Sequence, residues 1–300
     1  MFTNREISIQ TIFINIIIII TGILTILRII FYLPIFSDND IAFLRDVDYR
    51  IFFSLNRLGV IEFHSTTPTH YGSFYLYFWY FIFFPFSIIP IEIGVYIWDI
   101  ARLIAVIYIF KNINRISNNK KNIIMFLILC TLGYFADAYL NNSNWLVGLL
   151  LFVSYIELKK EKKWISGILF ALTLYKLSPI LFPIVLLIVK KIKLKDIIYF
   201  VIPTLIICLP YIIFPEYFWN FVFNLTLPRG IETTLEIIKF LRVIVMAFQT
   251  AHLIFFGFLT LIFLENLKNP KLISIFRIIL FSFLLFIGTL APLFAMLIFG

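Results

Sequence analysis

The sequence predicts an all-α integral membrane protein, and its composition, hydropathy and apolar runs each support that prediction. Hydrophobic residues make up 62% of the 300 residues, and charged residues make up only 14%. The mean hydropathy is +1.03. A water-soluble domain of this length carries far more polar surface, so the composition requires lipid as its solvent. The apolar residues also fall into runs that approach or exceed the ~20 residues of helix needed to cross a bilayer.

The net charge of +9 is concentrated in short gaps between the apolar runs. These basic gaps are residues 111–121, 159–163, 190–195 and 268–277. The pattern is that of cytoplasmic loops beside anionic lipid, and no sizeable soluble surface remains to bind nucleic acid. We therefore expect membrane lipids as partners and no nucleic acid. Arg5 precedes the first apolar run, which places the N-terminus in the cytoplasm.

The first half of the chain is expected to start with a spanning helix at 12–33 and an outer loop at 35–72. Within that loop, residues 42–58 have apolar side chains at helical spacing, which predicts an interfacial helix. Two crossings between residues 73 and 110 would put the lysines of 111–121 outside. We therefore expect one crossing at 91–110, preceded by a re-entrant or interfacial segment at 73–89.

The second half alternates more regularly, and about nine crossings are expected in all, within a range of about eight to eleven. Residues 164–176 and 178–189 form a hairpin of two short segments, because Lys176 and Pro179 interrupt the apolar run. Residues 215–235 form a second outer loop. The remaining crossings are expected at residues 123–139, 145–158, 197–214, 237–264 and 272–298. The whole chain, 1–300, forms one polytopic domain.

Ionisable residues inside apolar runs need an explanation, since each costs about 2.5–3.5 kcal/mol on insertion scales. Asp99 and Arg102 are three residues apart on one helix, which predicts a structural ion pair. Arg28 and Lys176 either extend to the outer interface or serve a site. Together with the aspartates of the first outer loop, such cations resemble a site for an anionic, lipid-linked substrate.

The sequence shows no motif for metal binding, for soluble nucleotide binding or for a serine nucleophile. The three histidines and two cysteines show no metal-ligand spacing, and Cys130 and Cys208 lie inside apolar runs. No phosphate-binding glycine loop and no nucleophile elbow are present. We therefore expect no metal and no cofactor.

Several segments resemble a known group of enzymes. The run Asp48-Tyr49-Arg50-Ile51-Phe52-Phe53, followed by Gly59, is similar to the acidic-aromatic "D-F-x-V-Y-Y…G" segment of GT-C polytopic glycosyltransferases. The closest resemblance is to glycosyltransferase family 87, the polyprenol-phosphate-mannose-dependent α-mannosyltransferases. Further positions that carry the resemblance are Tyr71, Pro85, Pro90, Asn144, Gly167, Lys176 and Pro179. The likeness covers about residues 10–190; the chain departs from it at Tyr71-Gly72-Ser73 and in lacking the Gln ahead of Asn144.

This resemblance implies a GT-C-like core at 1–190 with a catalytic outer loop at 35–72, and further helices at 191–300. It implies that a sugar, mannose in that family, leaves a polyprenyl phosphate with inversion and joins a glycan or glycolipid acceptor at the outer or lumenal face. Asp48 would be the general base, with Asp46 as the alternative, since the two point about 200° apart on a helix. Expected donor-phosphate ligands are Arg229, Arg242 and Lys176, and expected substrate contacts are Tyr49, His64, His70, Tyr71 and Asn144.

Two other functions remain compatible with the residues themselves. A lipid or solute transporter, such as a flippase, would use the same outer-face polar cavity without chemistry. A membrane scaffold would need no cavity. No repeat with matched broken helices relates the two halves of the sequence, as many transporters show.

Overall fold

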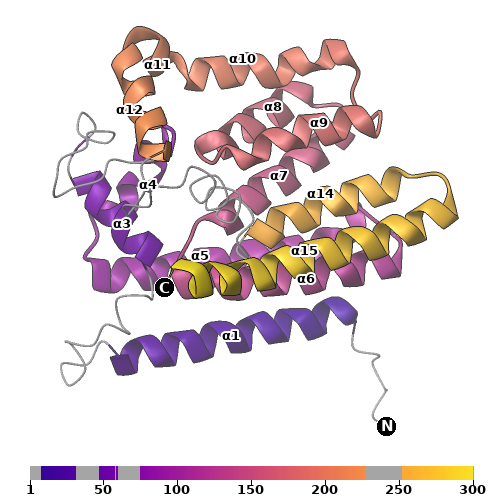
Figure 1. Ribbon diagram of the computed structural model, residues 1–300, viewed down its shortest axis with the longest axis horizontal. Coiled ribbons are helices and arrows are strands. Elements are labelled where there is room, and N and C mark those ends of the chain that lie inside the picture. The colour runs from indigo at the N-terminus through magenta and orange to yellow at the C-terminus, as the bar shows by residue number, and fades with distance from the viewer. Residues whose placement is uncertain (1–7, 32–46, 58, 60–74, 227–251, 300) are drawn as a thin grey trace.

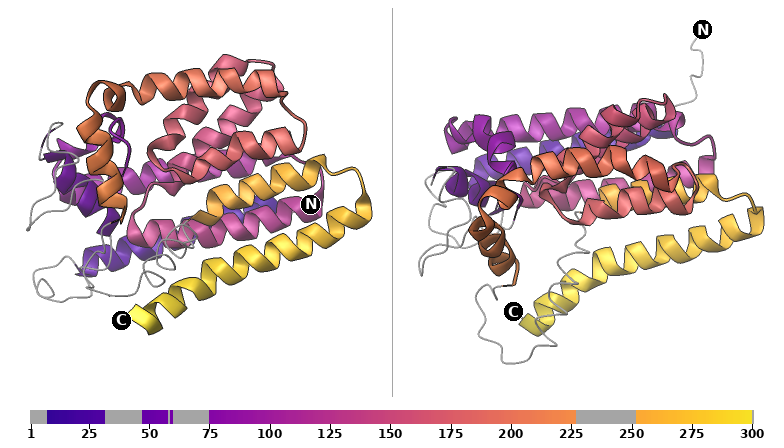
Figure 2. Two further views of the ribbon diagram at one scale, coloured as in Figure 1. Left: turned by 45° about the horizontal axis from the view of Figure 1, so that its top comes forward. Right: turned by 90° about the horizontal axis from the view of Figure 1, so that it is seen from above.

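The computed structural model describes residues 8–31, 47–57, 59, 75–226 and 252–299, and every regular element in these ranges is a helix. The all-α prediction is therefore confirmed for the described part of the chain. Figures 1 and 2 show the longest helices, α1, α5, α6 and α15, running roughly along one direction. A single large cluster of buried apolar side chains joins most of the helices into one body.

Three of the described helices are long and apolar enough to cross a membrane. They are α1 (Ile9–Phe31), α5 (Ile91–Asn112) and α6 (Lys120–Leu140). Each overlaps an apolar run that the sequence marks as a crossing. The helix α1 packs against both α5 and α6, so the three spans form one group (Figure 1).

Two short helices lie near the end of the bundle at which α1 finishes (Figure 1). The helix α3 (Val47–Arg57) covers most of the interfacial helix expected at 42–58. The helix α4 (Trp79–Ser87) has nine residues and contains Pro85. At 1.5 Å per residue it is roughly 14 Å long, too short for a hydrocarbon core of about 30 Å. The helix α4 is therefore too short to span the membrane alone, and the re-entrant or interfacial segment at 73–89 stays a prediction.

The hairpin expected around Lys176 is present. After α7 (Asn144–Lys159), the chain forms α8 (Lys163–Ala171) and the 3₁₀ turn η4 (Leu172–Tyr175). It leaves the helical conformation at Lys176, whose φ and ψ are −105° and 136°. It then resumes as η5 (Ser178–Ile180) and α9 (Leu181–Ile188). The helix break therefore falls on the lysine itself.

The C-terminal third differs in two places from the expectation. The run 197–214 is not one continuous helix but α10 (Ile198–Ile207) and α11 (Leu209–Ile213), because Pro210 cannot donate the hydrogen bond that would continue α10. The segment expected to open an outer loop at 215–235 is instead α12 (Pro215–Thr226). The loop prediction missed it because Tyr217 and Phe221, one turn apart, pack on other aromatic side chains.

The last two described helices form an antiparallel pair, α14 (Leu253–Asn266) and α15 (Pro270–Phe299) (Figure 1). Several described helices are too short to span a membrane alone, so the total of about nine crossings stays a prediction. Two further 3₁₀ turns complete the described elements, η3 (Ile113–Arg115) and η6 (Leu194–Ile197).

Candidate functional site

The helix α3 is held to the bundle by Tyr49. The backbone of Asp48 lies in the first turn of α3, immediately before Tyr49, and its side chain is outside the described part of the structure. The Tyr49 ring is fully buried and meets Phe83 and Trp98 edge-on, with ring centroids 5.2 and 6.0 Å away. Burial raises the pKa of Tyr49, so its hydroxyl stays protonated.

Trp98 of α5 connects these aromatic side chains to the turn between α6 and α7. Its indole N–H donates a hydrogen bond of 3.1 Å to the carbonyl of Asn142. Its ring also packs edge-on against Trp145, with centroids 5.1 Å apart. Because Tyr49 contacts Trp98, the helix that carries Asp48 lies close to this turn.

The turn itself is shaped by Asp137, which is fully buried at the end of α6. Its carboxylate accepts hydrogen bonds from the backbone N–H groups of Asn144, at 3.0 Å, and Trp145, at 3.4 Å. These groups open α7, where unpaired N–H groups and the helix dipole favour a negative charge. Asn141 ends α6 in the left-handed conformation, with φ of 56°, which Asn tolerates better than most residues. The turn is therefore fixed from both sides.

Lys176 enters the same turn from the break in the α8–α9 hairpin. Its ammonium group donates hydrogen bonds to the side-chain oxygens of Asn142 and Asn144, the latter at 2.8 Å. It also lies 5.7 Å from the centre of the Tyr75 ring. The neighbouring Tyr175 hydroxyl donates to the carbonyl of Ser143 at 2.7 Å, which ties the hairpin to the turn a second time.

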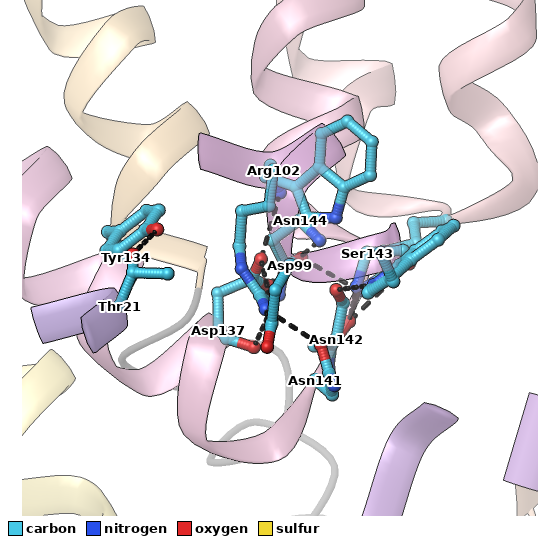
Figure 3. Close-up of polar contacts among 12 residues, drawn as sticks. Thr21, Asp99, Arg102, Tyr134, Asp137, Asn141, Asn142, Ser143 and Asn144 are labelled. Atoms are coloured by element: carbon cyan, nitrogen blue, oxygen red, sulfur yellow. Dashed lines mark hydrogen bonds and ion pairs between the residues drawn. The ribbon is translucent and has the colours of Figure 1, made fainter. Parts of the chain in front are cut away.

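A chain of opposite charges joins this turn to α1 (Figure 3 shows its α5–α6 part). Arg28 of α1 and Arg102 of α5 both form ion pairs with Asp99. Arg102 also donates to the carbonyl of Asp137 and to the side-chain oxygen of Asn141, each at 2.8 Å. We call the following eight residues the buried polar network: Arg28, Asp99, Arg102, Asp137, Asn141, Asn142, Asn144 and Lys176.

Several buried donors in and around the network lack an acceptor among the described residues. The two in the turn that Lys176 enters are the side-chain amide nitrogen of Asn144 and the indole nitrogen of Trp145; Nε of Arg102 and the indole nitrogen of Trp79 lack one as well. Buried polar groups are nearly always paired in folded proteins, so unpaired donors beside an ammonium group favour a ligand rich in acceptor oxygens. Phosphate and sugar oxygens fit that description.

The structure brings some of the expected site residues together. Lys176 and Asn144 are in direct contact, and Tyr49 lies in the aromatic group that borders the turn. Six other expected residues lie outside the described ranges: Asp46, His64, His70, Tyr71, Arg229 and Arg242. No group of three or more potential metal-ligating side chains gathers within the described ranges.

The role of Asp137 and the link from Arg28 to Asp99 were not predicted from the sequence. Arg28 does not extend to the interface, because its side chain is 1% exposed and is paired inside the bundle. A signal was present, since cations and carboxylates in separate apolar runs each need a partner of opposite charge. Their pairing across α1, α5 and α6 could not be read from one helix at a time.

The model of glycosyltransferase family 87 matches the chain over residues 74–286. Neither a curated protein nor a solved structure matches the chain. The matched region holds seven of the eight network residues and the hairpin, and it begins after α3. It covers more than half of the sequence, so the chain belongs to glycosyltransferase family 87 and is a membrane glycosyltransferase of the GT-C type.

Proposed function

We propose that this protein transfers a sugar, mannose by its likeness to the family, from a polyprenyl-phosphate donor to a glycan or glycolipid acceptor. The observation that carries the proposal is the position of Lys176. In a member of a glycosyltransferase family, this buried ammonium group lies beside two unpaired donors and close to the helix that bears Asp48.

The reaction needs a base for the acceptor hydroxyl. Asp48 takes the proton of that hydroxyl, and the acceptor oxygen forms a bond to the anomeric carbon of the sugar. The bond between that carbon and the phosphate oxygen breaks, and its electron pair stays on the phosphate. Attack from the face opposite the leaving phosphate inverts the anomeric configuration. General-base catalysis of this kind contributes about 10²–10⁴-fold.

The leaving group needs positive charge and hydrogen-bond donors. Lys176 supplies the charge, and the free amide of Asn144 and indole of Trp145 supply donors in a region shielded from water. Donors fixed in advance at low dielectric stabilise developing negative charge far better than they would in water. Arg229 and Arg242, outside the described residues, are further proposed phosphate ligands, with substrate contacts from Tyr49, His64, His70 and Tyr71.

We place the reaction at the outer or lumenal face, with the N-terminus in the cytoplasm. The lysine-rich turn at 159–163 then faces the cytoplasm, and α3 lies near the opposite end of the bundle (Figure 1). Cysteine labelling of Lys160→Cys, in a chain without Cys130 and Cys208, tests the orientation. A membrane-impermeant reagent should label that site only after the membrane is opened; labelling of intact cells would reverse the topology.

The activity is tested with the purified protein in lipid vesicles. Polyprenyl-phosphate mannose and polyprenyl-phosphate glucose are offered separately, with short α-mannosides and a membrane lipid extract as acceptors. Asp48→Asn should lower transfer by about 10²-fold or more, whereas Asp46→Asn should retain most of it. Equal transfer by wild type and Asp48→Asn would rule out Asp48 as the base. If Asp46→Asn loses transfer and Asp48→Asn retains it, Asp46 is the general base.

A further inference from the structure

Gly94, in the first turn of α5, borders the hydroxyl of Tyr49. A Cβ atom built on Gly94 would overlap that hydroxyl and would lie 3.2 Å from the ring carbon that carries it. The carbonyl of Phe86, in α4, lies 3.6 Å from the same point. The missing side chain of Gly94 is therefore what makes room for Tyr49.

The Tyr49 ring is enclosed by its neighbours. It is fully buried, with Phe83 of α4 and Trp98 of α5 in edge contact. Gly94 and Trp98 are one helical turn apart, so they border the ring along the same face of α5. If the space at Gly94 closes, the helix that carries Tyr49 has to shift.

The contact depends on shape and not on a hydrogen bond. The Tyr49 hydroxyl is buried and has no hydrogen-bond partner among the described residues. Removing the hydroxyl therefore breaks no such bond, while it removes the atom that a larger residue at position 94 would meet. This makes the contact separable from the rest of the packing.

We infer that Gly94 is a positioning residue for the reaction: by admitting Tyr49 against α5, it sets the place of α3 and hence of the preceding residue, Asp48. The inference rests on the proposed role of Asp48 as the base. Gly94 touches neither substrate in this scheme and acts only through Tyr49. Displacing a reacting group by about 1 Å can cost about 10²-fold in rate, so a small shift of α3 is enough.

The test is a double-mutant cycle in lipid vesicles with polyprenyl-phosphate mannose as donor. Gly94→Ala should lower kcat by about tenfold or more with a smaller effect on KM. Adding Tyr49→Phe should restore most of the rate of Tyr49→Phe alone, because the overlapping atom is gone and only the ring carbon, 3.2 Å from the added Cβ, remains close. Gly22→Ala on α1, which has open space around its Cβ position, is the matched control and should leave the rate unchanged.

A second measurement separates this inference from the proposed function. Hydrogen exchange of the backbone amides in residues 49–57 reports the docking of α3 without any sugar transfer. It should rise in Gly94→Ala and fall back when Tyr49→Phe is added. Unchanged exchange and rate in Gly94→Ala, or a loss that persists in the double variant, would overturn the positioning role. Full activity of Asp48→Asn would instead overturn the proposed base and leave the exchange result standing.

Discussion

Arg28 of α1 and Asp99 of α5 form an ion pair inside the bundle, with side chains 1% and 7% exposed. Arg102 shares the same carboxylate. Removing one partner of a buried pair leaves an uncompensated charge, so Asp99→Asn should destabilise the protein by about 3–5 kcal/mol. Arg28→Met should cost less, because Asp99 keeps Arg102. Thermal unfolding in detergent gives the order of the two variants. Glu157→Gln is the control, because the side chain of its partner Lys160 is 51% exposed, and it should change the midpoint far less.

Lys176 is expected to act on the chemical step. Lys176→Met removes the ammonium group that faces the leaving phosphate, and kcat should fall by about 10²–10³-fold. Lys176→Arg should recover only part of the rate, since a guanidinium group has a different shape and donor geometry. Lys121→Met, at an exposed lysine on α6, controls for the loss of one positive charge. A Lys176→Met protein that is folded and keeps most of the transfer rate would exclude Lys176 as a phosphate ligand.

Gly133 of α6 and Gly148 of α7 allow α14 to pack closely against these two helices. Substitution of either glycine by alanine should destabilise the protein, but a smaller residue at position 254 of α14 should relieve only one of the two substitutions. An added Cβ at Gly148 of α7 would lie 2.5 Å from the side chain of Ile254, whereas at Gly133 of α6 it would lie 2.8 Å from the backbone nitrogen of Ile254. Each Gly→Ala change should cost about 1–3 kcal/mol through overpacking. In an Ile254→Ala background the cost at Gly148 should largely vanish, while the cost at Gly133 should remain. Unfolding midpoints of the four proteins in each cycle decide this.

Asp196 makes the stability depend on acid pH. The backbone N–H of Lys193, at 2.9 Å, and the Lys163 ammonium group, at 3.0 Å, lower the pKa of Asp196 below its ordinary value of 3.8. A lowered pKa means that the folded state is favoured while the carboxylate is charged. The contribution is therefore complete above pH 3.8 and disappears as the pH falls through the lower folded value. Wild type should be more stable than Asp196→Asn at pH 6, and the difference should shrink below pH 3.8; a constant difference would contradict it.

Much of the fold was predictable because lipid imposes simple rules. The length of an apolar run identified α1, α5 and α6, each of which is long and apolar enough to cross a membrane. The break at Lys176 was predictable too. A charged residue is costly inside an apolar helix, and a proline close to it interrupts the helix hydrogen bonds. These features depend on local sequence alone.

The site was less predictable because its geometry depends on residues that are distant in sequence. Lys176 and Asn144 were expected in one site. The charge of Asp137 inside an apolar run indicated that it needs a partner, but nothing local showed that it fixes the turn that holds them. The helix α12 was missed for a similar reason, because its aromatic side chains pack on residues from other parts of the chain, such as Tyr77. Pairings of this kind arise from tertiary packing.

The chain of charges from α1 to α6 also bears on how the protein enters the membrane during synthesis. A lone charge in a membrane helix is costly, and the cost falls when an opposite charge is already in place. Arg28 is synthesised first, Asp99 and Arg102 follow in α5, and Asp137 comes last in α6. When α5 leaves the ribosome, Arg28 has therefore already been synthesised as a partner for Asp99. When α6 follows, Arg102 has already been synthesised as a partner for Asp137. The helices α5 and α6 can therefore join the bundle in the order of their synthesis, and each brings a charge that finds a partner of opposite sign in an earlier helix.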